Sequence, residues 1–358
     1  MSVFGGYNLG VLKLKNRFVR SATVEGMADI DGTPLPELIE IYETLARGGT
    51  GLIMTSAALP DRCWSAEPLM RLSIHSDETL QKWERFVKSL HRHGAAVAMQ
   101  LGPFSQLNGN PVGPSSYKPG IVEVKANEIG EISNTYGAAA ARARKAGFDG
   151  VQIHGCHGLP LGKFLSPYFN RRRDDYGGTH ANRARIFIEI RKAIAEHAGT
   201  DFPVWIKMNA YDGISGGITG EDAVIYGRIL KEGGYVAIEV TGGCPEGTWT
   251  SLGPNKKEDW FEGYYLEYAS RIKTDCDITT IAVGGIRTVE MAESVVADGT
   301  ADLVSLCRPL IREPDLVRRW VDGDAEPARC ISCNGCRAMV RKGKGLFCVQ
   351  EKAGRVSD

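Results

Sequence analysis

Short apolar runs alternate along the chain with longer segments in which apolar residues recur every three or four positions. The short runs predict strands, because strands buried in a parallel sheet are brief and almost wholly apolar. We expect strands at residues 17–20, 51–55, 95–101, 151–153, 204–208, 236–240, 279–283 and 303–306. The longer segments have the spacing of amphipathic helices. We expect helices at residues 35–46, 77–93, 129–146, 182–198, 221–232, 264–273, 289–297 and 315–321.

Eight strand–helix pairs in succession predict right-handed βαβ units and therefore a parallel sheet. Placed within residues 1–322, they fit an α/β fold of the (β/α)₈ TIM barrel type with insertions. An open, doubly wound sheet is the alternative. A barrel carries its chemistry at the carboxyl ends of its strands. Gln100 ends the third strand, and Lys207 lies near the end of the fifth. His154 and His157 stand where the fourth strand ends.

Composition excludes several function classes. The 358 residues carry a formal net charge of zero, so no basic excess points to nucleic acid or to an anionic membrane surface. No apolar run reaches the roughly 20 residues that span a bilayer, and the first residues lack a secretory signal. We therefore expect a cytoplasmic protein. The nine cysteines are then not expected to form disulfides, because that compartment is reducing.

Glycines and an arginine follow the last two predicted strands. Gly284 and Gly285 come after the seventh strand, and Cys307 and Arg308 come after the eighth. These two loops form the usual phosphate site of a TIM barrel. Glycine lets backbone N–H groups approach phosphate oxygens, and arginine adds a charge-assisted contact. The alternative is that the glycines only form tight turns. The pairing of both signals favours a phosphate site.

Two histidines three residues apart follow the fourth predicted strand. His154 and His157, whether neutral or protonated, can direct N–H donors at one electron-rich oxygen. The alternative is a pair of turn histidines that hydrogen-bond to the backbone. The spacing alone does not separate the two interpretations, because so short a motif is weak evidence.

The chain resembles the old yellow enzymes, a family of single-barrel, FMN-dependent oxidoreductases that reduce activated alkenes with NAD(P)H. The resemblance covers nearly the whole chain. It depends on the block that runs from His154 through Phe164-Leu165-Ser166-Pro167 to Tyr176-Gly177-Gly178. Asn16-Arg17-Phe18-Val19 near the start and the Gln100, Lys207, Gly-Gly and Arg308 positions add to it.

The resemblance implies a role for particular residues. Those expected around FMN are Ser21, Ala22, Thr23, Ser56, Gln100, Lys207, Gly284, Gly285, Cys307 and Arg308. Gln100 would bond the pyrimidine edge of the flavin, and Lys207 would place a cation near N1, which favours the reduced flavin. His154 and His157 would bind a carbonyl oxygen and so activate the β-carbon toward hydride from flavin N5. Asp174 and Arg183 would brace the adjoining loop.

Three positions depart from the family pattern. The usual tyrosine acid is replaced by Leu159, which cannot donate a proton. The proton would then come from elsewhere, or the reaction would differ. Val24 stands where relatives carry a cysteine or threonine against the flavin, and Cys307 replaces a glycine before the arginine. The alternative proton donors are Tyr168, Tyr211, Cys156 and water.

Four cysteines cluster within the predicted extension, residues 323–358. The ligand candidates are Cys330, Cys333, Cys336 and Cys348. Four thiolates at this spacing can hold zinc or an iron–sulfur cluster, whereas unrelated surface thiols are the plain alternative. The segment resembles the tail of 2,4-dienoyl-CoA reductase, trimethylamine dehydrogenase and 2-enoate reductase. That resemblance implies a [4Fe–4S] cluster, with zinc as the alternative.

The combined features predict an FMN-dependent enzyme that reduces an α,β-unsaturated carbonyl compound, a small molecule, with NAD(P)H. The alternatives are a flavin/iron–sulfur dehydrogenase and an electron-transfer subunit. An unrelated alternative is a phosphate-binding barrel lyase or isomerase without flavin, in which Lys207 would form a Schiff base. No GxGxxG motif follows a strand, so if a cluster is bound we expect its electrons to pass to a separate partner or a soluble carrier. Specificity is expected in residues 102–124 and 243–261, and a homo-oligomer is expected.

Overall fold

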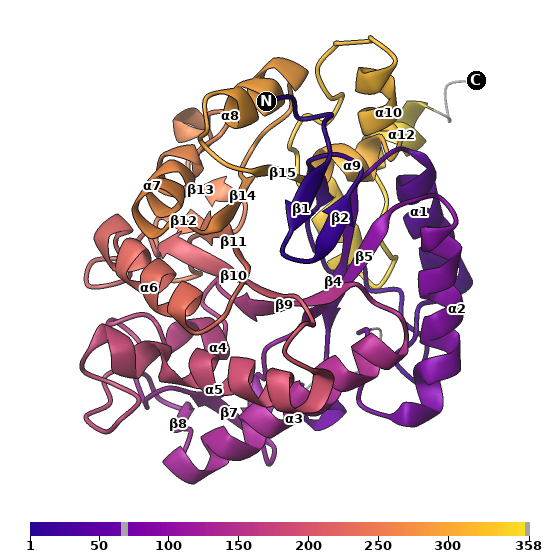
Figure 1. Ribbon diagram of the computed structural model, residues 1–358. Coiled ribbons are helices and arrows are strands. Elements are labelled where there is room, and N and C mark those ends of the chain that lie inside the picture. Colours follow the sequence, from indigo (N-terminus) through magenta and orange to yellow (C-terminus); the bar gives the residue numbers. More distant parts are fainter. Residues whose placement is uncertain (66–70, 355–358) are drawn as a thin grey trace.

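Eight parallel strands form a closed barrel in the computed structural model, which describes residues 1–65 and 71–354 (Figure 1). In barrel order the strands are β3 (Phe18–Arg20), β4 (Leu52–Ala58), β5 (Ala96–Leu101), β9 (Gly150–Gly155), β10 (Val204–Tyr211), β11 (Ala237–Gly242), β14 (Thr279–Val283) and β15 (Leu303–Leu306). Pairing of β15 with β3, in the register Ser305 to Val19, closes the ring. The predicted barrel is confirmed, and the open sheet is wrong.

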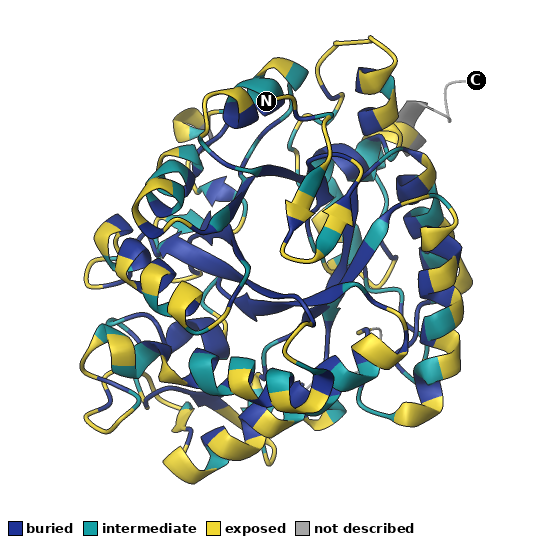
Figure 2. Cartoon of the chain, viewed as in Figure 1, coloured by how far each residue is buried: buried dark blue, intermediate teal, exposed yellow. Residues whose placement is uncertain are grey.

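Helices surround the barrel with their apolar faces inward, as the dark blue inner faces in Figure 2 show. They are α1 (Pro36–Arg47), α2 (Leu80–His91), α3 (Ala126–Lys145), α5 (His180–Ala198), α6 (Gly220–Glu232), α7 (Leu266–Cys276), α8 (Val289–Ala297) and α10 (Leu316–Val321). On α2, for example, Trp83, Phe86 and Leu90 are buried. All eight predicted helices are present, with ends that differ by a few residues.

A hairpin closes the amino-terminal end of the barrel. Strands β1 (Tyr7–Leu9) and β2 (Leu12–Leu14) lie across this opening in Figure 1. Leu9 and Leu14 pack with Trp205 and the other apolar side chains inside this end of the barrel. Because this end is filled by side chains, a ligand must enter from the opposite end, where the strands finish. This hairpin was not predicted.

The loops at the carboxyl end carry small extra elements. The loop after β5 contains β6 (Gln106–Leu107), β7 (Asn110–Gly113) and β8 (Val122–Glu123). The loop after β11 contains the hairpin of β12 (Trp249–Thr250) and β13 (Gly253–Pro254). The helices α4 (Pro160–Lys163) and α9 (Arg308–Arg312) follow β9 and β15. Both loops that were predicted to set specificity thus lie at the end where the strands finish.

The segment that contains the four cysteines packs on the outside of this end. It includes α11 (Gly335–Arg341) and α12 (Val349–Gly354), and α11 has no buried residue. Between residues 329 and 351 only Gly345 and Leu346 are buried. Gly345 packs on Met27. Residues 355–358 of the predicted extension lie outside the described residues. Within the described ranges, no helix has the length and apolar character that crossing a membrane requires.

Candidate active site

A layer of polar side chains forms the floor of the site inside the barrel. Its members are Ser21, Gln100, Gln152, Lys207, Glu239 and Ser305. Glu239 is the centre, because its Oε1 accepts from Lys207 Nζ at 2.8 Å and from Ser21 Oγ at 2.7 Å. Its Oε2 accepts from Gln152 Nε2 at 2.7 Å, and Gln152 in turn accepts from Gln100 Nε2 at 2.7 Å. The expected flavin contacts Gln100 and Lys207 therefore belong to one network.

Both charges of the floor are stable. Burial lowers the pKa of Lys207, but the charge and hydrogen bond of Glu239, with Cys156 and Cys307, together outweigh burial, and the net shift is upward. Burial raises the pKa of Glu239, but Lys207 and the hydroxyl and amide donors outweigh it, and the net shift is downward. A buried charge is tolerated only when it is paired and hydrogen-bonded, and here both conditions hold. Lys207 is therefore a permanent cation and not a neutral amine, which disfavours the Schiff-base alternative.

The histidine pair lies next to this floor at the end of β9. His154 is still within the strand, and His157 follows it with a left-handed backbone, φ 59°. The two ring centroids are 5.3 Å apart with planes at 76°. Asn209 Oδ1 accepts from the His157 backbone N–H at 3.0 Å, and Thr241 Oγ1 lies 3.0 Å from His157 Nε2. β10 and β11 thus hold the second imidazole in place.

Both imidazoles are neutral at neutral pH. Burial and then Lys207 lower the pKa of His154 to about 4. Burial and then His154 lower the pKa of His157 well below its ordinary value. A neutral imidazole carries one N–H, so each ring can give one hydrogen bond to an incoming oxygen. A Thr241 hydroxyl that donates to Nε2 would leave N–H at Nδ1 of His157.

Among the proposed proton donors, Cys156 contacts the histidine pair. Its buried Sγ lies 3.7 Å from His154 Nδ1, and burial raises the pKa of its thiol. Tyr168 packs edge-on against Phe169, and Tyr211 stacks on Tyr268. Leu159 is 38% exposed.

The same region also resembles a small metal site. Ligand atoms of His154, Cys156 and His157 lie within 4.8 Å of one another. The positive charge of Lys207 nearby, which lowers the pKa of both imidazoles, opposes a bound cation. The arrangement therefore suits a polarised oxygen better than a metal ion.

The loops after β14 and β15 carry the residues that were predicted to hold a phosphate. Gly284 and Gly285 have φ values of 133° and 73°, which residues with a side chain rarely adopt. A Cβ on Gly285 would come within 2.9 Å of the Tyr264 ring. Cys307 precedes α9, and Arg308 is the first residue of that helix. Glycine backbone, an arginine and the polar floor fit the phosphate and the ring system of FMN.

The remaining predicted flavin contacts follow β3 and lie in β4. Ser21 is part of the floor, and Ala22 and Thr23 are partly exposed just beyond it. Ser56 is buried, and its N–H donates to the Tyr42 hydroxyl at 2.9 Å. Val24 is 47% exposed, so this side chain is open to the surface.

The loop that follows the histidines is braced by charge. Arg172 Nε donates to Asp174 Oδ1 at 2.9 Å, and the Arg172 guanidinium also reaches the backbone oxygens of Pro114 and Val124. This arrangement ties the loop after β9 to the loop after β5. Arg183, the other expected brace, has no hydrogen-bond partner for its buried Nε among the described residues.

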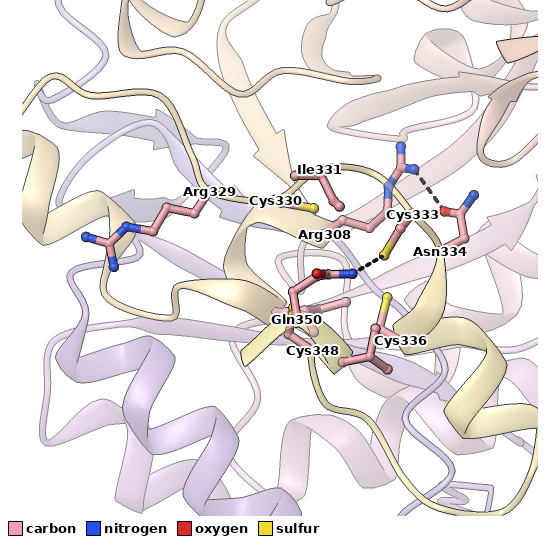
Figure 3. Close-up of a pocket in the computed structure, with 11 residues that line it drawn as sticks. Arg308, Arg329, Cys330, Ile331, Cys333, Asn334, Cys336, Cys348 and Gln350 are labelled. Atoms are coloured by element: carbon pink, nitrogen blue, oxygen red, sulfur yellow. Dashed lines mark hydrogen bonds between the residues drawn. The ribbon is translucent and has the colours of Figure 1, made fainter. Parts of the chain in front are cut away.

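The four clustered cysteines line one pocket, and Figure 3 shows their side chains with Arg308 and Asn334. Cys348 Sγ accepts from Arg312 Nη1 at 3.5 Å, and Cys333 Sγ accepts from Gln350 Nε2 at 3.9 Å. Ser332 and Asn334 both have left-handed backbones, with φ 56° and 58°. The loop thus bends sharply around a sulfur-lined space. Thiolate sulfurs are the ligands of iron–sulfur clusters and of structural zinc. Among the described residues, however, only His154, Cys156 and His157 bring their ligand atoms close enough together to hold one metal ion, and the four cysteines do not.

Sequence reasoning missed Gln152, Asn209, Glu239 and Thr241. Glu239 offered a signal, because it is a lone charge in the apolar run 236–240. Lys207 was expected near a strand end, but β10 continues to Tyr211, so Lys207 lies inside the strand. The polar Asn209 had interrupted the apolar run, because it faces the site and not the core.

Comparison with known proteins identifies the family. The model of the NADH:flavin oxidoreductase / NADH oxidase family matches residues 2–326. The chain belongs to this family. The family match ends just before Cys330.

Two relatives and one solved structure show the extent of the similarity. The chain is 33% identical to an NADH oxidase of Thermoanaerobacter brockii over 94% of this chain and 53% of that protein. It thus spans about half of that relative's length. An NADPH dehydrogenase of Listeria innocua serovar 6a is 34% identical over 87% of this chain and 92% of that protein. The structure of a 2-naphthoyl-CoA reductase aligns with 97% of this chain, and the aligned part makes up 56% of that protein's chain. The TM-score is 0.89 and the sequence identity is 23%.

Proposed function

We propose that the chain is an FMN-dependent oxidoreductase that uses NAD(P)H to reduce the alkene of an α,β-unsaturated carbonyl compound. The observation that carries this proposal is the pair of neutral imidazoles beside a charged, buried Lys207 at the open end of the barrel. FMN bound there would supply a hydride from N5. The NAD(P)H donor provides the electron pair, and one proton completes the saturated product.

The chain's own residues would bind and orient both molecules. Gly284, Gly285 and Arg308 would hold the FMN phosphate, and Gln100 and Lys207 would contact the polar edge of its ring system. Ser21, Ala22, Thr23, Ser56 and Cys307 would complete the flavin site. His154 and His157 would each give one N–H to the carbonyl oxygen, which draws electron density from the β-carbon.

The proton at the α-carbon needs a donor other than Leu159. Cys156 and water remain the candidates of this proposal, because the Cys156 thiol stays protonated and contacts His154. Leu159→Tyr should raise enone reduction if the missing acid limits the rate, since a positioned acid is worth about 10²–10⁴-fold. An unchanged rate in L159Y together with a fall in C156A would assign the proton to Cys156.

We also propose that Cys330, Cys333, Cys336 and Cys348 bind a [4Fe–4S] cluster, with zinc as the competing occupant. The support is a pocket lined by all four sulfurs and two N–H···S contacts, which are typical tuning interactions of clusters. The segment also buries too little apolar surface to fold well alone, and bound metal commonly supplies such folding free energy. On this proposal residues 323–358 form a cofactor-binding unit beside the barrel.

A flavin dehydrogenase that passes electrons through the cluster to a separate partner is the second candidate. Leu159 favours it, because oxidation does not need the missing acid, and the cysteine pocket offers an electron exit. Anaerobic mixing separates the two directions. Reoxidation of the NAD(P)H-reduced enzyme by enones supports the first candidate. Reoxidation by one-electron acceptors alone, with reduction by an organic donor, supports the second.

The site itself is tested by ligand binding. H154A and H157A should lose affinity for phenols, which mimic an enolate oxygen, and should keep FMN. H197A is the matched control, because His197 bonds Asn134 on the outer helices. Equal phenol affinity in all four proteins would remove the histidines from the site. A chain that shows no flavin absorbance after incubation with FMN would remove the whole proposal.

The cluster needs its own control. C336S should lose iron and sulfide after anaerobic purification, whereas C63S should keep both, since Cys63 is an exposed cysteine outside the pocket. Stoichiometric zinc in the unmodified chain would contradict the cluster and leave the flavin proposal intact.

A further inference from the structure

The arginine expected to hold the FMN phosphate is bonded to the cysteine loop. Arg308 Nη1 donates to Asn334 Oδ1 at 2.9 Å, and both side chains are labelled in Figure 3. Asn334 lies between Cys333 and Cys336 and adopts φ 58° immediately before α11. The direction of its side chain is therefore set by the same loop that places two of the four sulfurs.

The other phosphate loop is attached to the same segment. Arg287 follows Gly284 and Gly285 closely, and its Nη1 donates to the Cys330 backbone oxygen at 3.3 Å. The Arg287 backbone oxygen accepts from Ala328 N–H at 2.8 Å, and its guanidinium lies 4.5 Å from the Trp260 ring. Both loops that would surround the phosphate thus contact the cysteine segment.

We propose that Asn334 is a positioning residue for FMN. Its hydrogen bond holds the side chain of Arg308, the residue expected to bind the FMN phosphate. This inference rests on the proposed function, namely that FMN binds at the barrel and metal at the cysteines. Asn334 occupies one of the five N–H donors of Arg308 and Tyr264 also interacts with it, which leaves the remaining donors for phosphate oxygens. A free arginine must lose much rotamer freedom when it binds an anion. An arginine already held by Asn334 loses less, so its ligand binds more tightly.

The coupling must act in both directions. If a folded cysteine loop raises the affinity for FMN, bound FMN must stabilise that loop by the same factor. Phosphate is the group that makes the connection, because Arg308 is the residue that both sides share. Riboflavin has the same ring system without the phosphate, so its binding should not depend on Asn334.

The test compares the affinities of two flavins in the metal-loaded chain. N334G removes the amide and suits the left-handed backbone. Q350A is the matched control, because Gln350 contacts Cys333 Sγ in the same pocket, whereas the hydrogen bond of Arg308 in this loop goes to Asn334. FMN and riboflavin are titrated separately and followed by the quenching of their fluorescence, and iron is measured in each preparation.

The expected result is an FMN affinity about threefold to tenfold lower in N334G with riboflavin affinity unchanged, as expected for one immobilised side chain. Q350A should match the unmodified chain for both flavins. Unchanged FMN affinity in N334G, or an equal loss for FMN and riboflavin, overturns the inference. In either case, normal FMN binding by the unmodified chain leaves the proposed function standing. If the unmodified chain binds no FMN, both fail together.

Discussion

Two buried ion pairs in this molecule differ in how completely their charged groups are hydrogen-bonded. Lys207 and Glu239, in the floor of the site, are 2.8 Å apart, and both Glu239 oxygens accept hydrogen bonds. Arg20 and Glu25, between the barrel and α1, are 3.5 Å apart. Glu25 Oε2 and Arg20 Nε have no hydrogen-bond partner among the described residues.

The pKa values follow this difference. The pKa of Glu239 is lowered, because Lys207 and its neighbours outweigh burial. The pKa of Glu25 is raised to about 7, because burial outweighs Arg20 and the Tyr42 hydroxyl. Both carboxylates are buried next to a cation, so proximity to a cation is not sufficient. Complete hydrogen bonding separates a fixed charge from one that takes up a proton near neutral pH.

The largest effect should come from breaking the floor pair. Lys207→Met leaves Glu239 buried without its cation, and loss of one partner of a buried pair typically costs about 3–5 kcal/mol. The measurement is the free energy of unfolding in urea. The double variant K207M/E239Q should recover part of this cost, because neither charge is then left alone. Additive losses in the double variant would mean that the two residues act independently.

A pH-dependent effect of about 3 kcal/mol is expected at Glu25, from a pKa raised from 4.5 to about 7. The folded state holds the proton more tightly than the unfolded state. The stabilisation is therefore complete below pH 4.5 and is lost as pH rises through 7. Glu25→Gln removes this titration. As pH rises from 4.5 to about 7, the unfolding free energy of the unmodified chain should therefore fall relative to that of Glu25→Gln. Parallel pH profiles would contradict the assignment.

Removal of a single hydrogen bond from the floor should cause a smaller loss of unfolding free energy. Ser305 Oγ donates to Glu239 Oε1 at 3.0 Å, and a hydrogen bond to a charged group contributes about 1.5–3 kcal/mol. Ser305→Ala should lower the unfolding free energy by an amount near the low end, because Lys207 and Ser21 still donate to the same oxygen. A loss as large as that of K207M would show that the network collapses as a unit.

The smallest effect is expected at an exposed pair. Lys88 and Glu84 are 2.6 Å apart on the outer face of α2, where both side chains are largely in solvent. Solvent screening leaves such a pair little effect on stability. Lys88→Ala should therefore change the unfolding free energy less than any of the three variants above, and less in high salt than in low salt. A loss as large as that of Ser305→Ala would show that distance, and not burial with hydrogen bonding, ranks these pairs.

The sequence was sufficient for the barrel, because each strand and helix has its own local apolar period. The same locality explains the misses. Nothing local indicates that the hairpin of Leu9 and Leu14 fills the lower end of the barrel, since its partners, such as Trp205, are distant in sequence. The end of β10 was displaced because Asn209, which faces the site, interrupts the apolar run, and the strand continues to Tyr211.

The parts of the candidate site that lie in short sequence motifs were predictable. The parts that depend on contacts between residues far apart in the sequence were not. The histidines, the glycines and the four cysteines lie in short patterns that can be read directly. Glu239, which organises the floor, bonds to residues from four other strands or loops, and no spacing in the sequence reveals that meeting. The bond from Arg308 to Asn334 is hidden for the same reason.

The central claim is that one chain holds FMN at the barrel and an iron–sulfur cluster at the cysteines. The most direct test measures flavin, iron, acid-labile sulfide and zinc in the same anaerobically purified, FMN-loaded sample. The account predicts one FMN per chain with four iron and four sulfide ions, the content of a [4Fe–4S] cluster held by four cysteines. A chain without flavin, or one with zinc in place of iron and sulfide, would contradict it.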